Sequence, residues 1–179
     1  TGTAPTLGKI TAGVVLAGCA GGQGRRRQHM TQESVLAYAH LLAILSLVVF
    51  LSSEAALCRA EWMNEAVVRR LGRLDLIYGL SALAVLLSGL ARIQWGMKGG
   101  DWYWSNPWLH AKLALLVVIA ALSLVPTRRF IRWRKALDVG GGLPPPDEVR
   151  RARRFVMWQA HLLALVPLAG VAMARGFGA

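Results

Sequence analysis

Long apolar blocks separated by short charged links dominate the chain. The blocks cover residues 35–57, 76–93, 107–125 and 155–174, and each is long enough to cross a hydrocarbon core of roughly 30 Å as a helix. Only helices and closed barrels satisfy their backbone hydrogen bonds in lipid, and these Leu- and Ala-rich blocks show no strand-like alternation. The pattern predicts an all-α integral membrane protein, a four-helix transmembrane bundle formed by residues 30–179.

Residues 1–29 differ from the rest in being rich in Gly and in ending on an Arg triplet, after which Gln28, His29 and Met30 follow. A His-Met pair is what a cloning site leaves, and Met30 makes a convincing start. We therefore expect 1–29 to be a cloning-derived leader or the product of upstream translation. The alternative is a lipoprotein signal, because residues 16–19 (Leu-Ala-Gly-Cys) resemble a lipobox after a short apolar run.

Basic residues gather in two of the three links, in a chain whose net charge is +12. The first and third links lie on the same side of a four-span chain and hold thirteen Lys and Arg, whereas the second link holds only Arg92 and Lys98. By the positive-inside rule, the first and third links face the cytoplasm, and the second link and both termini face outward. We therefore predict a multi-pass protein of the bacterial inner membrane with both termini periplasmic, and no nucleic-acid partner.

The links also carry aromatic and helix-ending residues. Amphipathic rings prefer the headgroup level, so the rings around the second link predict an aromatic belt, with a ring-lined mouth for a flat ligand as the alternative. These rings belong to Trp95, Trp102, Tyr103, Trp104 and Trp108. Asn106 and Pro107 predict the cap and first turn of the third helix. Pro126 predicts its end, and segment 59–73 predicts a separate interfacial helix.

Ionisable residues inside a membrane span are costly and point to function, and six residues within or beside the predicted spans are the candidates. They are His40, Glu54, Asp75, His110, Lys112 and His161. His40, His110 and Lys112 share the outer third, and the other three lie lower. His110 and Lys112 point about 200° apart at 100° per residue, so they cannot face the same partner. We expect His40 opposite either Lys112 or His110, and a lower polar layer of Glu54, Asp75 and His161.

Two histidines at equal depth on facing helices are what a b-type haem needs. His40 and His110 are the candidate metal ligands, and haem b or a porphyrin is the candidate cofactor. The candidate cofactor-binding residues are His40, Lys112, His110, His161 and Trp108. Alternatively, Lys112 extends to the outer surface and the histidines only link helices by hydrogen bonds. We expect Glu54 and Asp75 to pair with Arg69, Arg70 or Arg73 at the inner surface.

Four stretches of the chain resemble known families. The runs at 75–82 and 122–134, the latter containing Pro-Thr-Arg-Arg-Phe-Ile-Arg-Trp-Arg, resemble a bacterial family of four-helix membrane proteins of unknown function. The segments 39–43 and 108–113 (Trp-Leu-His-Ala-Lys-Leu) are similar to the first and third spans of HemJ-type protoporphyrinogen oxidases, and more loosely to CopD-type copper-resistance proteins. The HemJ resemblance implies that His40 and Lys112 handle haem or porphyrin.

Three functions are consistent with these observations. The first is a haem- or porphyrin-binding protein, a haem-linked membrane oxidoreductase that passes electrons to quinone or a redox partner. The second is copper or small-solute handling, although soft copper ligation needs Met and Cys clusters and only Met97 and Met173 approach the outer face. The third is an accessory subunit without chemistry. The lipid bilayer is the expected partner. The sequence leaves undecided whether the chain also forms a homo-oligomer.

Overall fold

The computed structural model describes residues 7–95 and 104–175, with side chains from Met30 onward except those of 173 and 174. All regular elements in this part of the chain are helical, as the apolar blocks predicted. They are α1 (Leu7–Leu57), the short helix η1 (Ala60–Trp62), α2 (Glu65–Trp95), α4 (Pro107–Asp138) and α5 (Pro146–Ala174). Four helices are long and apolar enough to cross a membrane, namely Met30–Leu57, Glu65–Trp95, Pro107–Asp138 and Pro146–Ala172.

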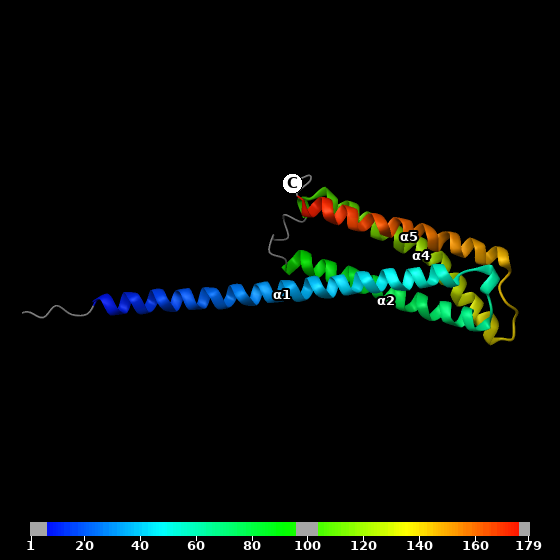
Figure 1. Ribbon diagram of the computed structural model, residues 1–179, viewed down its shortest axis with the longest axis horizontal. Coiled ribbons are helices and arrows are strands. Elements are labelled where there is room, and N and C mark those ends of the chain that lie inside the picture. Colours follow the sequence, from blue (N-terminus) through cyan, green and yellow to red (C-terminus); the bar gives the residue numbers. More distant parts are fainter. Residues whose placement is uncertain (1–6, 96–103, 176–179) are drawn as a thin grey trace, which may run out of the picture.

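The helices form two hairpins, because α1 packs along α2 and α4 packs along α5. Contacts of α2 with α4 and of α1 with α5 join the hairpins. Figure 1 shows the hairpins converging toward the end that carries η1 and the 139–145 loop, whereas α1 extends beyond the other helices at the opposite end. We name these the basic end, after the arginines gathered there, and the distal end.

The main hydrophobic core lies in the half of the bundle near the basic end. All four helices contribute to it, and its members are Leu47, Leu51, Cys58, Val68, Leu71, Tyr78, Phe130, Trp133, Val149, Ala152 and Val156. On the outside, large apolar side chains such as Leu41, Leu76 and Leu87 are exposed. Such surfaces would be costly in water, but lipid tails are equally apolar. The outer faces of the helices therefore suit contact with a bilayer.

Local sequence signals set two helix ends. The Asn106 side chain accepts a hydrogen bond from the backbone N–H of Trp108 (3.0 Å), and Pro107 opens α4, as predicted. At the other end of α4, Gly140 adopts a positive φ of 76°. The N–H of Gly141 donates to the carbonyl of Ala136 at 2.8 Å. This arrangement closes the last turn of α4, and it requires glycine because other residues rarely adopt that φ.

The prediction that Pro126 ends the third helix is wrong, because α4 continues to Asp138. A proline inside a helix costs about 3 kcal/mol or more. Beyond it, however, Phe130 and Trp133 are 0% and 5% exposed in the core. Burial of each large side chain contributes roughly 1.5–3 kcal/mol, so packing offsets the cost of the proline.

The predicted interfacial helix over 59–73 is also not observed. The chain makes only the single turn η1 there, and α2 begins at Glu65 and runs unbroken into its apolar part. Asn64 caps α2, since its side-chain oxygen accepts from the N–H of Val67 at 2.9 Å. Val68 and Leu71 are fully buried, so the apolar face of this segment packs into the bundle core and does not lie along a membrane surface.

Candidate functional site

His40 lies on α1 in the distal half of the bundle and is held against α2. Its Nδ1 is 2.8 Å from the Ser88 hydroxyl oxygen, and that hydroxyl donates its own proton to the Ala84 carbonyl at 2.6 Å. Because a serine has one proton to give, the contact fits the tautomer that carries its proton on Nδ1. In that tautomer the lone pair lies on Nε2, the nitrogen that could bind a metal.

Gly89 makes this close approach possible. A Cβ atom at Gly89 would lie 3.3 Å from His40 Cε1, tighter than an ordinary contact. The missing side chain thus lets the imidazole lie directly on the α2 backbone.

Two cationic side chains on other helices, Arg92 of α2 and Lys112 of α4, are near enough for their charges to act on His40. Lys112 of α4 is partly buried and reaches toward α5, with Nζ 3.7 Å from the Cβ position of Gly170. The charges of Arg92 and Lys112 both act on His40, and the charge of Arg92 also acts on Lys112. Within the described residues, ion pairs involve only Arg69 and Arg150. The group of His40, Arg92 and Lys112, here the His40 cluster, therefore gathers positive charge without a paired carboxylate.

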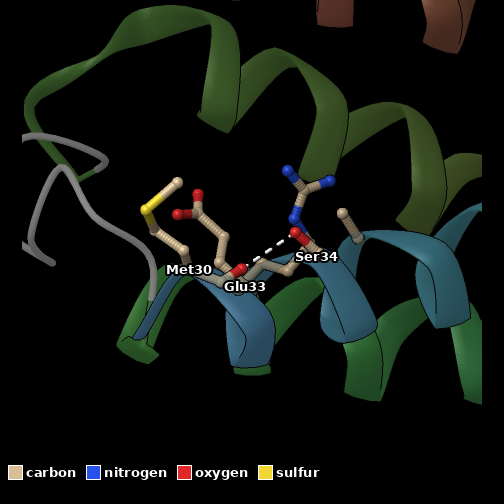
Figure 2. Close-up of a pocket in the computed structure, with 5 residues that line it drawn as sticks. Met30, Glu33 and Ser34 are labelled. Carbon is tan, nitrogen blue, oxygen red and sulfur yellow. Dashed lines mark hydrogen bonds between the residues drawn. The ribbon is translucent and has the colours of Figure 1, made fainter. Parts of the chain in front are cut away.

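A shallow groove opens beside the His40 cluster at the distal end. It has a volume of about 240 Å³ and is lined by Met30, Glu33, Ser34, Ala37 and Arg92. Figure 2 shows Met30, Glu33 and Ser34 on the α1 side, with the Ser34 hydroxyl donating to the Met30 carbonyl at 2.8 Å. Arg92 belongs both to the groove and to the cluster, so the cluster is connected to the distal surface.

The other predicted site residues lie elsewhere. His110 is exposed, its Nδ1 is 3.2 Å from the Asn106 carbonyl, and its ring meets Trp104 edge-on with the centroids 6.3 Å apart. His161 is also exposed, with Nδ1 2.6 Å from the Met157 carbonyl of its own helix. Trp108 is partly buried in the first turn of α4. The structure thus brings His40 together with Lys112 and leaves His110 and His161 on outward faces.

Some predicted residues lie outside the described part of the chain. These are Trp102 and Tyr103 of the aromatic belt, Lys98 and Met97, and the side chain of Met173. Of the remaining belt residues, Trp95 and Trp104 are exposed at the distal end.

A second polar group, here the Glu54 layer, lies in the half near the basic end. Glu54 and Gln159 are each 1% exposed and Asp75 is 8% exposed. The Thr127 hydroxyl donates to Asp75 Oδ1 at 2.8 Å, and the Tyr78 hydroxyl donates to Gln159 Oε1 at 3.1 Å. Neither Glu54 Oε1 nor Gln159 Nε2 has a hydrogen-bond partner among the described residues.

The expected pairing of Glu54 and Asp75 with arginines is wrong. Arg69 instead pairs with Glu65 at 3.0 Å and with Asp138 at 2.7 Å, outside the core. His161, expected in the same layer, is exposed on α5. The physical reason is helix rotation: Glu54 continues the buried stripe that includes Leu47 and Leu51, so its carboxyl enters the bundle and cannot reach the surface arginines.

The family described as predicted membrane protein (DUF2214) matches residues 32–178, which include all four long helices and both polar groups. The chain belongs to the DUF2214 family. Neither the curated proteins nor the solved structures contain a match to it.

In this DUF2214 chain, donor geometry limits how a metal could be held. No three His, Cys, Asp or Glu side chains come together as a metal-ion group in the described residues. A metal held by protein ligands alone needs several such donors, whereas haem iron needs only one or two because the macrocycle supplies the rest. At His40 the described residues offer one imidazole as a metal donor.

Cys58 follows the end of α1 in the DUF2214 fold and is fully buried. Its thiol lies 3.8 Å from the Val149 carbonyl. The pKa of Cys58 is raised to about 12, chiefly by burial and further by negative charge on Glu54, against the opposing charges of Arg153 and Arg129. A thiol with this pKa holds its proton under ordinary conditions, so Cys58 is a packing residue and not a nucleophile.

Sequence reasoning missed several residues of both polar groups. Arg92 counted only as a link charge, and Ser88, Tyr78, Thr127 and Gln159 were not singled out. A signal existed for the residues of α2, because Asp75, Tyr78, Ser81, Ser88 and Arg92 recur at helical spacing on one side of that helix.

Proposed function

We propose that this DUF2214 protein binds haem b or a porphyrin at the His40 cluster, between the helices of a bacterial inner-membrane bundle. One observation carries the proposal: the His40 imidazole has Nδ1 2.8 Å from the Ser88 hydroxyl, and the charges of Arg92 of α2 and Lys112 of α4 both act on it. The resemblance of the segments around His40 and Lys112 to HemJ-type spans supports the same reading.

The chemistry of the cluster suits an anionic tetrapyrrole. His40 would be the protein ligand of the iron, because neutral imidazole is a common haem ligand. Arg92 and Lys112 would bind the carboxylates of the macrocycle, which balance the positive charge of the cluster. Trp108, in the first turn of α4, would cover an edge of the ligand at the membrane surface. His110 and His161 would not share in ligation, since both lie on outward faces.

Bound haem would supply one-electron chemistry, and the protein would then act in electron transfer with a quinone or a protein partner. Copper or small-solute handling and an accessory role remain the alternatives from sequence. Neither requires a bound pigment, so the same experiment separates them from the proposal.

The test is an absorption spectrum of protein purified in mild detergent after expression with a haem precursor. The wild type is expected to show a Soret band that is lost or shifted in His40→Ala. His161→Ala is the matched control, because it removes an exposed imidazole from α5 and should keep the band. A colourless wild type that also fails to take up added haem would overturn the proposal. An unchanged spectrum in His40→Ala would exclude His40 as the ligand.

A further inference from the structure

The Glu54 layer places two carboxyl groups in a nonpolar interior without a cationic partner. Glu54 and Asp75 are close enough for their charges to act on each other. Arg69 makes its ion pairs at the surface. Two ionised carboxylates in such a site would repel each other in a medium of low dielectric constant, and each would carry a large desolvation cost. The arrangement is tolerable only if positive charge, as a proton or a cation, accompanies them.

The two carboxyl groups are not equivalent. Asp75 accepts a hydrogen bond from Thr127, which suits an ionised carboxylate. Glu54 has no such donor, and its Oε1 is buried without a partner among the described residues. A carboxyl group that receives no hydrogen bond and faces a second carboxylate is the one that gains most from holding a proton.

The Glu54 layer also contains a buried neutral amide, the side chain of Gln159. Gln159 of α5 is 1% exposed, and its carbonyl oxygen accepts from Tyr78, while its Nε2 has no partner among the described residues. Buried amide donors are nearly always hydrogen-bonded in folded proteins. Gln159 Nε2 and Glu54 Oε1 are thus two buried polar atoms without a partner among the described residues. A small polar ligand, such as water or a hydrated proton, is what would satisfy such atoms.

We propose that the Glu54 layer is a proton-binding site in which Glu54 holds a proton that exchanges with water at the basic end. On release, the O–H bond of the Glu54 carboxyl breaks and the proton passes to water, so the step needs no oxidant or reductant. Glu54 is three residues, about 4.5 Å, from the end of α1, so the path to the basic end is short. The site does not depend on the tetrapyrrole, because Glu54 lies about 21 Å along α1 from His40.

The groups around Glu54 come from every neighbouring element. α2 contributes Asp75 and Tyr78, whose hydroxyl is already engaged with Gln159. The segment after α1 contributes the Cys58 thiol, on which Glu54, Arg153 of α5 and Arg129 of α4 act. Arg129 and Arg153 make no ion pair with Glu54 among the described residues, but positive charge in this neighbourhood would favour the carboxylate that proton release leaves behind.

Infrared spectroscopy of purified protein in lipid tests the proposal, because a protonated carboxyl has a carbonyl stretch separate from the amide bands. The wild type is expected to show this band at neutral pH, and the band should shift after transfer to D₂O. Glu54→Gln should lose one carboxyl band, whereas the exposed control Glu61→Gln on η1 should keep it. Asp75→Asn should also keep the band, because the proton is assigned to Glu54.

Three results would overturn the proposal. The first is a wild-type spectrum without a protonated carboxyl at neutral pH, a measurement that stays decisive even if Glu54→Gln does not fold. The second is a band that does not shift in D₂O, which would mean a sealed structural proton. The third is loss of the band on adding NaCl but not choline chloride, which would make Na⁺ the occupant. None of these outcomes depends on whether the protein binds a pigment.

Discussion

Replacing Gly89 by alanine tests whether His40 is held against α2. The new Cβ atom would lie 3.3 Å from His40 Cε1 and 3.9 Å from Nδ1. The imidazole must then move by a few tenths of an ångström, which stretches its 2.8 Å hydrogen bond to Ser88. Gly79→Ala on the same helix is the matched control, because nothing lies within 4 Å of its added methyl group.

The expected magnitudes follow from two opposing terms. Alanine favours a helix over glycine by about 0.8–1.0 kcal/mol, so Gly79→Ala should stabilise the protein by about that amount. Gly89→Ala gains the same term and loses up to the net value of one hydrogen bond, about 0.5–1.5 kcal/mol. The stability of Gly89→Ala should therefore lie near that of the wild type. At this chain length 1 kcal/mol shifts Tm by roughly 2–4 °C, so the gap between the two variants corresponds to roughly 1–6 °C.

Thermal unfolding in detergent, followed by circular dichroism, measures both variants against the wild type. Spectra of haem-reconstituted samples add a second readout, since displacement of the ligating ring should weaken haem binding in Gly89→Ala only. The reasoning is refuted if the two variants raise Tm equally and Gly89→Ala binds haem as the wild type does. That result would mean that the ring does not rest on Gly89.

Three further predictions concern other parts of the molecule. Cys58 should resist maleimide labelling in the folded protein and react on denaturation, and rapid labelling of the native protein would contradict this. Because its pKa is raised to about 12, the free energy of unfolding that Cys58 contributes is present below the ordinary thiol pKa and is lost as the pH rises toward 12. Lys112→Met should leave Tm within a few degrees of the wild type but reduce porphyrin affinity roughly tenfold, which corresponds to the loss of about 1.4 kcal/mol of charge-assisted binding. Unchanged porphyrin titrations would show that Lys112 only extends to the surface. Reporter fusions after Lys135 and after Gly99 should be active in the cytoplasm and the periplasm respectively, and the reverse pattern would invert the proposed orientation.

The sequence predicted the parts of the fold that depend on one helix at a time. Uninterrupted apolar length identifies a spanning helix without knowledge of its neighbours, and the Asn106 cap is a purely local signal. Depth along a span is also local, since it follows from the position of a residue within its apolar block, and it is the basis on which His40 and Lys112 were predicted to share a level. The course of α4 past Pro126 was not predictable in this way, because it depends on the core that receives Phe130 and Trp133.

The orientation of side chains about each helix axis could not be predicted from one sequence. His110 and Lys112 were known to point in different directions, but which of them faces His40 depends on how α4 meets α1 and α2. The same information was missing for Glu54, since arginines nearby in the sequence suggested a surface pair. Burial by α2 and α5 places its carboxyl in the interior instead. Arg92 was overlooked because a residue near a helix end is assigned to the membrane surface by default.

The pairing of α1 with α2 and of α4 with α5 also bears on how the chain assembles. Each pair is contiguous in sequence and joined by a short connection, so most helix contacts within it are local and can form soon after the two helices enter the bilayer. Docking of the two preformed hairpins then remains as the later step, and it buries the core near the basic end. The ion pair between Arg69 of α2 and Asp138 of α4 joins the hairpins at that end. Substitutions in the contact between α2 and α4 should thus slow assembly while leaving membrane insertion unchanged.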